Sequence, residues 1–352
     1  MARQWRCAVI GTGTVGEWHV RTIPKLPNCQ LVAVCDVENA KGSGALKKNS
    51  LEAPVYTDIE EMYRTEKIDV VHVCTPSGDH KSPAIHAMEH GKNVVVEKPM
   101  EIHPDRIDDM IAAAKKQDVK LAGIFQNRWN EANRAIRDAV AAGRFGRIAW
   151  AGSFTPWYRN DEYYEKGGWR GTWRMDGGGS VMNQGVHQVD LMQWIVGPVK
   201  TVSAYASSRI HPKIEVEDTL TCAFQFESGA FGTFVSTTAM WPGGPTRFEV
   251  GGENGTAISE NGLKRFEFRE VLAEDAALLE RLNPARAKTT GGGKSATDIG
   301  LDFHGMNMRD IYAAWDRGEE AETCGPEARK AVSIIHAMYE SVRKNGAPID
   351  VK

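Results

Sequence analysis

An α/β domain followed by an α+β domain with a large, mostly antiparallel open sheet is the fold that this 352-residue sequence predicts. Over the first 125 residues, short apolar runs alternate with helical stretches. After about residue 145 the runs instead mix polar and apolar residues and are separated by glycine-containing turns. The chain is long enough for two cores, which we place in domains 1–125 and 126–352.

Composition and charge are those of an ordinary globular protein. Hydrophobic residues make up 41% and charged residues 25%, which excludes a disordered or fibrous chain. The net charge of −3 gives no broad attraction to nucleic acid or acidic lipid, and no apolar run is long enough to span a membrane. The N-terminus shows no signal segment, and the six cysteines contain no CxxC pair. We therefore expect a cytoplasmic protein without a metal site.

The strands expected in the first domain are apolar on successive residues, which is typical of a parallel sheet buried on both faces. They are residues 7–11, 31–37, 69–76, 93–99 and 120–125. Helices expected between them include 58–66, 80–91 and 104–117. Strands and helices in this order form βαβ units.

The strands expected in the second domain often alternate polar and apolar residues, as antiparallel strands with two different faces do. They are residues 147–158, 199–209, 218–228, 229–240, 247–259 and 263–270. A helix is expected within 177–197, and 283–300 is expected to be a mobile surface loop. This loop is no P-loop, because Lys288 stands where the motif needs its first glycine.

A glycine motif in the first domain predicts a dinucleotide site. Gly11, Gly13 and Gly16 follow the first strand in GxGxxG spacing, and Asp36 ends the second strand. In a Rossmann domain these glycines allow the tight turn, the approach of the pyrophosphate and close helix packing. The helix start favours phosphate charge, and the carboxylate binds ribose hydroxyls but repels a 2′-phosphate. The motif therefore favours NAD over NADP.

Two later strand ends carry polar residues at the edge where such sheets bind ligands. Thr75, Pro76 and His80 either line the cofactor groove or only end the strand and cap the next helix. Glu97 and Lys98 follow three valines, which argues against an ordinary surface ion pair. The proline after Lys98 restricts the lysine backbone and fixes the direction of its amine.

The stretch GGGSVMNQGVHQVDLMQWIVG (177–197) places polar residues in an otherwise apolar helix. Asn183, His187 and Asp190 share one helix face at spacings of four and three. Histidine suits proton transfer because its pKa lies near neutrality, and the triple glycine would leave room for a ligand. Asp190 either orients the imidazole or pairs with an arginine elsewhere. A purely structural polar network is the alternative.

The segment 157–174 is rich in aromatic and basic residues. It is either a substrate loop, with Tyr163 stacking on a sugar and Arg159 or Arg174 pairing with an anionic group, or a packed segment that closes the domain.

Taken in order, GxGxxG, TP…H, EKP and GGG…NxGxHxxD resemble the glucose–fructose oxidoreductase, inositol dehydrogenase and MocA family over most of the chain. The resemblance implies an NAD(P)-binding domain, and a second domain whose open sheet mediates oligomerisation. It implies Lys98, Asn183 and His187 as catalytic residues, although relatives often have aspartate at position 183, so that His187 would be the sole base. Residues 157–187 are similar to the branch that oxidises C3 of UDP-N-acetylglucosaminuronate and to glycoside 3-dehydrogenases.

The expected binding residues combine these motifs with the resemblance. Those expected to bind NAD are Gly11, Gly13, Thr14, Val15, Gly16, Asp36, Thr75, Pro76, His80, Glu97, Lys98, Asn127, Trp169 and Arg170. Those expected to bind substrate are Lys98, Arg159, Tyr163, Asn183 and His187.

We therefore expect an NAD-dependent enzyme, a homodimer or homotetramer, that oxidises a secondary hydroxyl of a sugar, glycoside or sugar nucleotide at C3. Two alternatives stay open. One is a redox-assisted glycosidase that forms a transient 3-keto sugar and regenerates its NAD. The other is a non-catalytic NAD-binding sensor.

Overall fold

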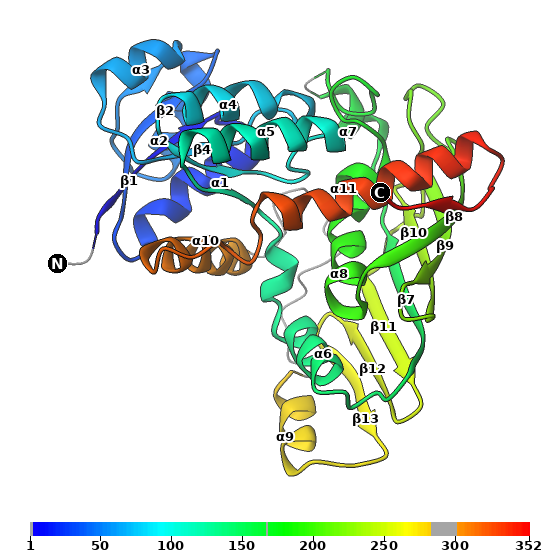
Figure 1. Cartoon of the computed structure of the whole chain (residues 1–352). Coiled ribbons are helices and arrows are strands. Elements are labelled where there is room, and N and C mark those ends of the chain that lie inside the picture. The colour runs from blue at the N-terminus through cyan, green and yellow to red at the C-terminus, as the bar shows by residue number, and fades with distance from the viewer. Residues whose placement is uncertain (1–2, 167, 283–300) are drawn as a thin grey trace. The chain divides into compact units, whose positions relative to one another are not determined.

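The structure is a computed structural model that describes residues 3–166, 168–282 and 301–352. The predicted loop 283–300 lies outside the described residues. The chain forms two compact units (Figure 1). The first comprises Met1–Gln126 with Gly300–Arg329, and the second comprises Asn127–Ile299 with Lys330–Lys352.

The first unit is built on a parallel sheet of six described strands in the order β3-β2-β1-β4-β5-β6. Their bounds are β1 Trp5–Ile10, β2 Cys29–Cys35, β3 Val55–Tyr56, β4 Val70–Val73, β5 Asn93–Val96 and β6 Leu121–Gly123. All four residues of β4 are buried, as expected of a strand covered on both faces. The parallel sheet expected from the sequence is confirmed.

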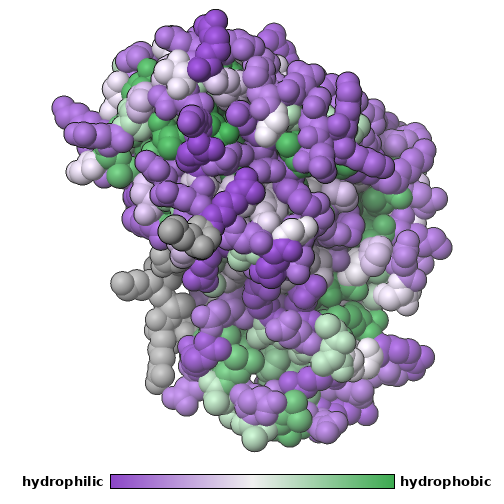
Figure 2. All heavy atoms as spheres, turned by 60° about the vertical axis from the view of Figure 1, so that its left-hand side comes forward, coloured by the Kyte–Doolittle hydropathy of each residue, from purple (hydrophilic) through white to green (hydrophobic). Residues whose placement is uncertain are grey.

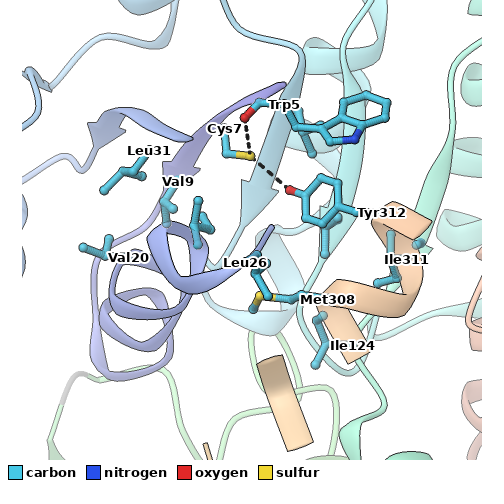
Figure 3. Close-up of a cluster of buried hydrophobic side chains, with 14 of the residues drawn as sticks. Trp5, Cys7, Val9, Val20, Leu26, Leu31, Ile124, Met308, Ile311 and Tyr312 are labelled. Carbon is cyan, nitrogen blue, oxygen red and sulfur yellow. Dashed lines mark hydrogen bonds between the residues drawn. The ribbon is translucent and has the colours of Figure 1, made fainter. Parts of the chain in front are cut away.

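Helices surround this sheet (Figure 1). They are α1 Thr14–Thr22, α2 Asn39–Lys48, α3 Ile59–Thr65, α4 Lys81–Glu89, α5 Pro104–Gln117 and α10 Leu301–Asp316. The sequence placed α10 in the second domain. It belongs to the first unit because Met308, Ile311 and Tyr312 enter the core formed with Trp5 and Val9 of β1 (Figure 3).

The second unit contains a sheet of eight described strands in the order β13-β12-β11-β7-β10-β9-β8-β14. Their bounds are β7 Ile148–Pro156, β8 Val199–Ser207, β9 Thr219–Phe226, β10 Phe231–Thr237, β11 Arg247–Gly252, β12 Gly255–Glu260, β13 Leu263–Phe268 and β14 Ile349–Asp350. Neighbours pair antiparallel except β7 and β10, which run parallel. Burial alternates along β9, so the mostly antiparallel, two-faced sheet is confirmed.

The predicted helix within 177–197 consists of two parts. Ser180–Gly185 form a π-helix, η4, and Val186–Val196 continue as the α-helix α8. The α8 residues contact β7, and the η4 residues contact β10. The unit's other helices are α6 Glu131–Ala141, α7 Asp161–Glu165 and α9 Ala273–Arg281, and α11 Gly325–Arg343 enters it at Lys330.

No helix among the described residues is long and apolar enough to cross a membrane. The face shown in Figure 2 is mostly hydrophilic, with smaller hydrophobic areas between the polar side chains. Large aromatic side chains nevertheless reach the solvent from the second unit's sheet, with Tyr205 on β8 63% exposed and Phe231 on β10 61% exposed.

Candidate active site

The glycine turn after β1 has the geometry of a nucleotide-binding loop. Gly11 has φ +84°, and a Cβ there would lie 2.7 Å from the carbonyl oxygen of Cys74. A Cβ on Gly16 would lie 1.9 Å from the Gly11 carbonyl oxygen, so the α1–β1 packing requires glycine. At Gly13 a Cβ would meet no atom within 4 Å. Because the protein's own packing makes no demand at Gly13, this position is open for a ligand to approach the backbone.

Asp36 lies beside this turn. Its Oδ2 accepts hydrogen bonds from the backbone N and the Oγ1 of Thr12, at 2.8 and 2.9 Å, and its Oδ1 accepts one from Glu38 N at 3.0 Å. Helix α1 begins directly after Gly13, where backbone N–H groups favour a phosphate. The turn, the helix start at Thr14 and the carboxylate therefore fit a dinucleotide with free ribose hydroxyls, which is NAD.

His80 joins the two strand ends expected at the ligand edge. Its Nδ1 lies 2.9 Å from the Pro99 carbonyl oxygen and its Nε2 lies 2.9 Å from the Thr75 carbonyl oxygen. Burial lowers the pKa of His80, so the ring is neutral and its single N–H donates to one carbonyl at a time. One alternative was that His80 only caps the helix that follows, but its side chain makes no capping hydrogen bond to α4. It links the Thr75-Pro76 turn to the Glu97-Lys98-Pro99 turn.

Glu97 is directed into the first unit. Its Oε1 lies 2.8 Å from His19 Nε2 and 3.3 Å from His304 Nε2, and its Oε2 accepts the backbone N–H of Lys98 at 3.0 Å. Burial would raise the pKa of Glu97, but the bonds from the two histidines hold this pKa well below its usual range. The ionised carboxylate thus fixes the backbone of the half-buried Lys98.

A chain of buried polar groups continues inward from Glu97. His19 Nδ1 lies 2.8 Å from His72 Nδ1, and His72 Nε2 lies 2.6 Å from the Tyr312 hydroxyl. That hydroxyl lies 3.1 Å from Cys7 Sγ, a contact drawn as a dashed line in Figure 3. The residues come from α1, β4, α10 and β1, and each is at most 3% exposed.

Counting the available protons assigns a donor and an acceptor to each hydrogen bond in this row of buried groups. Burial lowers the pKa of both His19 and His72, so each neutral ring carries one N–H. His19 must donate from Nε2 to the Glu97 carboxylate, so its Nδ1 accepts from His72 Nδ1–H. His72 Nε2 then accepts from Tyr312. The bonds from Tyr312 to His72, from His72 to His19 and from His19 to Glu97 thus all point toward the buried carboxylate and supply it with a donor.

We call the continuous helical segment formed by η4 and α8 (residues 180–196) the site helix. Within it, Asp190 pairs with an arginine. Its carboxylate accepts from Nε and Nη2 of Arg128, at 2.8 and 2.5 Å, and both side chains are 1% exposed. Of the two roles considered for Asp190, the structure shows pairing with an arginine. Arg128 lies 62 residues away in the sequence.

The triple glycine before η4 is explained by packing. A Cβ on Gly179 would lie 1.7 Å from the Glu217 carbonyl oxygen, and one on Gly178 would lie 1.9 Å from the Tyr339 hydroxyl oxygen. The buried Glu217 carboxylate accepts from Gly179 N at 3.0 Å and Val181 N at 2.9 Å, capping the helix start. The glycines thus admit Glu217 and Tyr339, rather than leaving the room for a ligand that the sequence suggested.

Asn183 is held by a second carboxylate. Its Nδ2 donates to Asp176 Oδ1 at 2.7 Å, and Asp176 Oδ2 accepts the backbone N–H of Gly171 at 2.9 Å. Asp176 thus accepts one of the two N–H donors of the Asn183 amide. The carbonyl oxygen of Asn183 is the acceptor of this side chain. His187 follows in the first turn of α8 and is 6% exposed.

Tyr163 lies between two arginines. The Cζ atoms of Arg159 and Arg170 lie 5.2 and 4.7 Å from its ring centre. Its hydroxyl accepts from Gln184 Nε2 at 2.9 Å, which ties this aromatic segment to η4. Arg170 also lies over the ring of Trp169, at 5.0 Å. Two positive charges thus lie around one ring, and the hydrogen-bond partner of this ring, Gln184, lies between Asn183 and His187 in the sequence.

The expected residues divide between the units. The first holds Gly11, Gly13, Thr14, Val15, Gly16, Asp36, Thr75, Pro76, His80, Glu97 and Lys98. The second holds Asn127, Arg159, Tyr163, Trp169, Arg170, Asn183 and His187. Sequence reasoning missed Asp176, Gln184 and Glu217. Asp176 and Gln184 had a signal, since the first precedes the triple glycine and the second adjoins Asn183, but nothing local marks Glu217.

Two family models match this chain. Residues 5–125 match an oxidoreductase family with an NAD-binding Rossmann fold, and residues 133–258 match the GFO/IDH/MocA C-terminal domain. The fold and the site define an NAD-dependent oxidoreductase. The chain belongs to the glucose–fructose oxidoreductase, inositol dehydrogenase and MocA family.

Solved structures of dehydrogenases resemble the whole chain. The WlbA dehydrogenase from Chromobacterium violaceum, in complex with NADH and UDP-GlcNAcA, is 32% identical with a TM-score of 0.87, covering 99% of this chain and 96% of that one. The WlbA dehydrogenase from Bordetella pertussis, with the same ligands, is 28% identical with a TM-score of 0.87, covering 99% and 98%. The D-glucoside 3-dehydrogenase of Escherichia coli is 28% identical over 64% of this chain and 67% of its own length.

Proposed function

We propose that this protein oxidises a secondary hydroxyl, at C3, of an anionic sugar or sugar nucleotide, with the first unit holding NAD and the second holding the substrate. The observation that carries this proposal is the site helix, in which Gln184, the hydrogen-bond partner of Tyr163, lies between Asn183 and His187. Similarity to two dehydrogenases crystallised with UDP-GlcNAcA supports the proposed substrate class. Similarity to a glucoside 3-dehydrogenase supports C3 as the carbon that is oxidised.

His187 is the general base of the proposed reaction. It takes the proton of the reacting hydroxyl, and Lys98 donates a hydrogen bond to the same oxygen and stabilises its developing negative charge. NAD supplies the acceptor for the carbinol hydrogen when it is bound. Because Asn183 is an amide and is held by Asp176, it orients the substrate and transfers no proton.

Arg159, together with Arg170, which the sequence had assigned to NAD, selects the charge of the proposed substrate. Two guanidinium groups around Tyr163 favour a ligand carrying a carboxylate or phosphate, since both groups match the fork of donors on arginine. A uronate or a sugar nucleotide fits this arrangement better than a neutral glycoside does.

To test this proposal, the purified protein is incubated with each member of a panel of glucosides, uronates and UDP-sugars and with either NAD or NADP. Formation of the reduced nicotinamide is monitored by its absorbance. We expect NAD reduction with the anionic sugars. We expect Lys98→Met and His187→Ala each to lower kcat by about 10²–10⁴-fold, and His187→Ala to leave NAD binding by thermal shift intact. Unchanged turnover in both variants would overturn the assignment. NAD binding without reduction across the panel would instead favour the glycosidase or the sensor.

We also propose that copies of the chain associate through the second unit's sheet. Tyr205 and Phe231 are exposed there, and large apolar side chains in water favour burial against a partner. A dimeric or tetrameric mass by light scattering at micromolar concentration is expected, and a monomeric mass would rule the association out.

A further inference from the structure

Two histidines and a glutamate gather on the surface of the first unit, away from the glycine turn in sequence. Glu60 lies in the first turn of α3, His86 lies in the last turn of α4, and His90 follows α4 directly (Figure 1). His86 Nε2 lies 2.9 Å from Glu60 Oε1, and His90 Nε2 lies 3.6 Å from Glu60 Oε2. The ligand atoms of all three residues lie within 4.8 Å of one another.

These separations match those around one small divalent ion. A tetrahedral Zn²⁺ holds nitrogen and oxygen ligands at about 2.0–2.2 Å, which places neighbouring ligand atoms about 3.3–3.6 Å apart. The observed 3.6 Å lies at the upper end of this range and 2.9 Å lies below it, so Glu60 and His86 would have to move apart to admit the ion. Exposed ion pairs of both histidines with one carboxylate would account for these two distances as well, and the orientation and packing of the rings favour a metal site over them.

The orientation of His90 is that of a metal ligand. Its Nδ1 lies 2.9 Å from the carbonyl oxygen of His86. A carbonyl only accepts, so Nδ1 carries the proton, and in the neutral ring Nε2 presents a lone pair toward Glu60. Metal-binding histidines are commonly fixed in this way by a hydrogen bond from their other nitrogen. A cation between this nitrogen and the Glu60 carboxylate would bind both.

Ring packing holds both imidazoles in place. Tyr63, one turn along α3 from Glu60, stacks on His86 with a ring separation of 5.6 Å and an interplanar angle of 19°. It also lies 4.9 Å from the His90 ring, and the two histidine rings are 4.6 Å apart. Preorganised ligand rings lose less conformational freedom when an ion binds.

We propose that Glu60, His86 and His90 form a binding site for a divalent transition-metal ion, with Zn²⁺ the best match. Imidazole and carboxylate ligands together suit Zn²⁺, whereas Mg²⁺ prefers oxygen ligands alone. The three side chains are 32–52% exposed, so water fills the remaining coordination positions. The ion would join α3 to the end of α4.

The sequence predicted no metal site, because its six cysteines contain no CxxC pair. Glu60 is separated from the two histidines by β4, so the three residues do not form one local motif. The spacing of four between His86 and His90 was the one available signal, since it places both rings on the same helix face.

Isothermal titration of the chelator-treated full chain with ZnCl₂ tests the proposal. We expect one Zn²⁺ per chain, no saturable binding of Mg²⁺, and a higher Tm with Zn²⁺. His86→Gln and His90→Gln should each weaken Zn²⁺ binding at least about tenfold. His103→Gln, which changes an exposed histidine of the same unit outside the cluster, should bind like the unaltered chain.

Circular dichroism of each variant is to be compared with that of the unaltered chain, so that a loss of binding in a folded variant reports on the ligands. The proposal would be overturned if Zn²⁺ did not saturate at one site, or if the double variant His86→Gln/His90→Gln bound it with unchanged affinity.

Discussion

Arg128 and Asp190 form a fully buried, doubly hydrogen-bonded ion pair between the segment before α6 and the site helix α8. Removing one partner leaves an uncompensated charge in the interior, which costs much more than the pair itself contributes. The pair therefore anchors the helix that carries His187.

Breaking this pair should destabilise the protein strongly. We expect Arg128→Met or Asp190→Leu each to lower the free energy of unfolding by about 3–5 kcal/mol, measured by urea denaturation. The double variant should recover part of that loss, because neither charge is then left unpaired. Additive losses in the double variant would show that the two residues act independently.

NMR can determine which groups donate and which accept in the row of buried hydrogen bonds that ends at Glu97. With ¹⁵N-labelled histidine at pH 7, we expect His19 to be protonated at Nε2 and His72 at Nδ1, both neutral. The opposite pair of tautomers would mean that Glu97 is protonated. Tyr312→Phe removes the donor to His72 Nε2 and should cost about 1–3 kcal/mol of stability.

Glu217 should make stability depend on pH. Burial raises its pKa to about 7, although hydrogen bonds from Val181 and Gly179 oppose this shift. Because the folded protein binds the proton more tightly than the unfolded chain, this contribution is full below about pH 4.5 and is lost as pH rises toward 7.

Glu217→Gln cannot titrate, so its Tm should decrease less than that of the unaltered chain between pH 5 and about pH 7.5. The variant should also be less stable at pH 5, since its amide nitrogen faces a backbone N–H as a second donor. Equal pH profiles for the two proteins would show that another group controls this range.

Asp36 should determine the choice of cofactor. Asp36→Ser removes the charge that repels a 2′-phosphate, so we expect the ratio of kcat/KM for NADP to that for NAD to rise at least about tenfold. The ratio is the proper readout, because Asp36 also holds Thr12 and its loss weakens both cofactors. Asp105→Ser, at an exposed carboxylate of the same unit, should leave the ratio unchanged.

The fold was predictable wherever short-range pattern determines structure. Four consecutive buried residues in β4 and alternating burial in β9 follow directly from the apolar pattern. The two-residue strand β3 is too short to give such a pattern, and α10 joins the first unit through side-chain packing that no local sequence encodes. The glycine turn and Asp36 were predictable because their spacing is itself the signal.

Much of the candidate site depends on contacts between distant residues. Asp190 and Arg128 are separated by 62 positions, and Glu97 and His19 by 78, so the sequence alone left the role of Asp190 open and did not show the chain behind Glu97. The triple glycine was visible, but its reason, the approach of Glu217 and Tyr339, required coordinates.

The π-helical turn Ser180–Gly185 bears on how this segment tolerates changes in length. A π-turn holds one residue more than an α-helix of the same hydrogen-bonded span, and each α-helical residue rotates the chain by about 100°. Deleting one residue here would let the helix relax to regular α geometry and would turn Asn183 and His187 relative to each other. Shortening this segment by one residue would therefore change the directions of Asn183 and His187 while the helix itself persists.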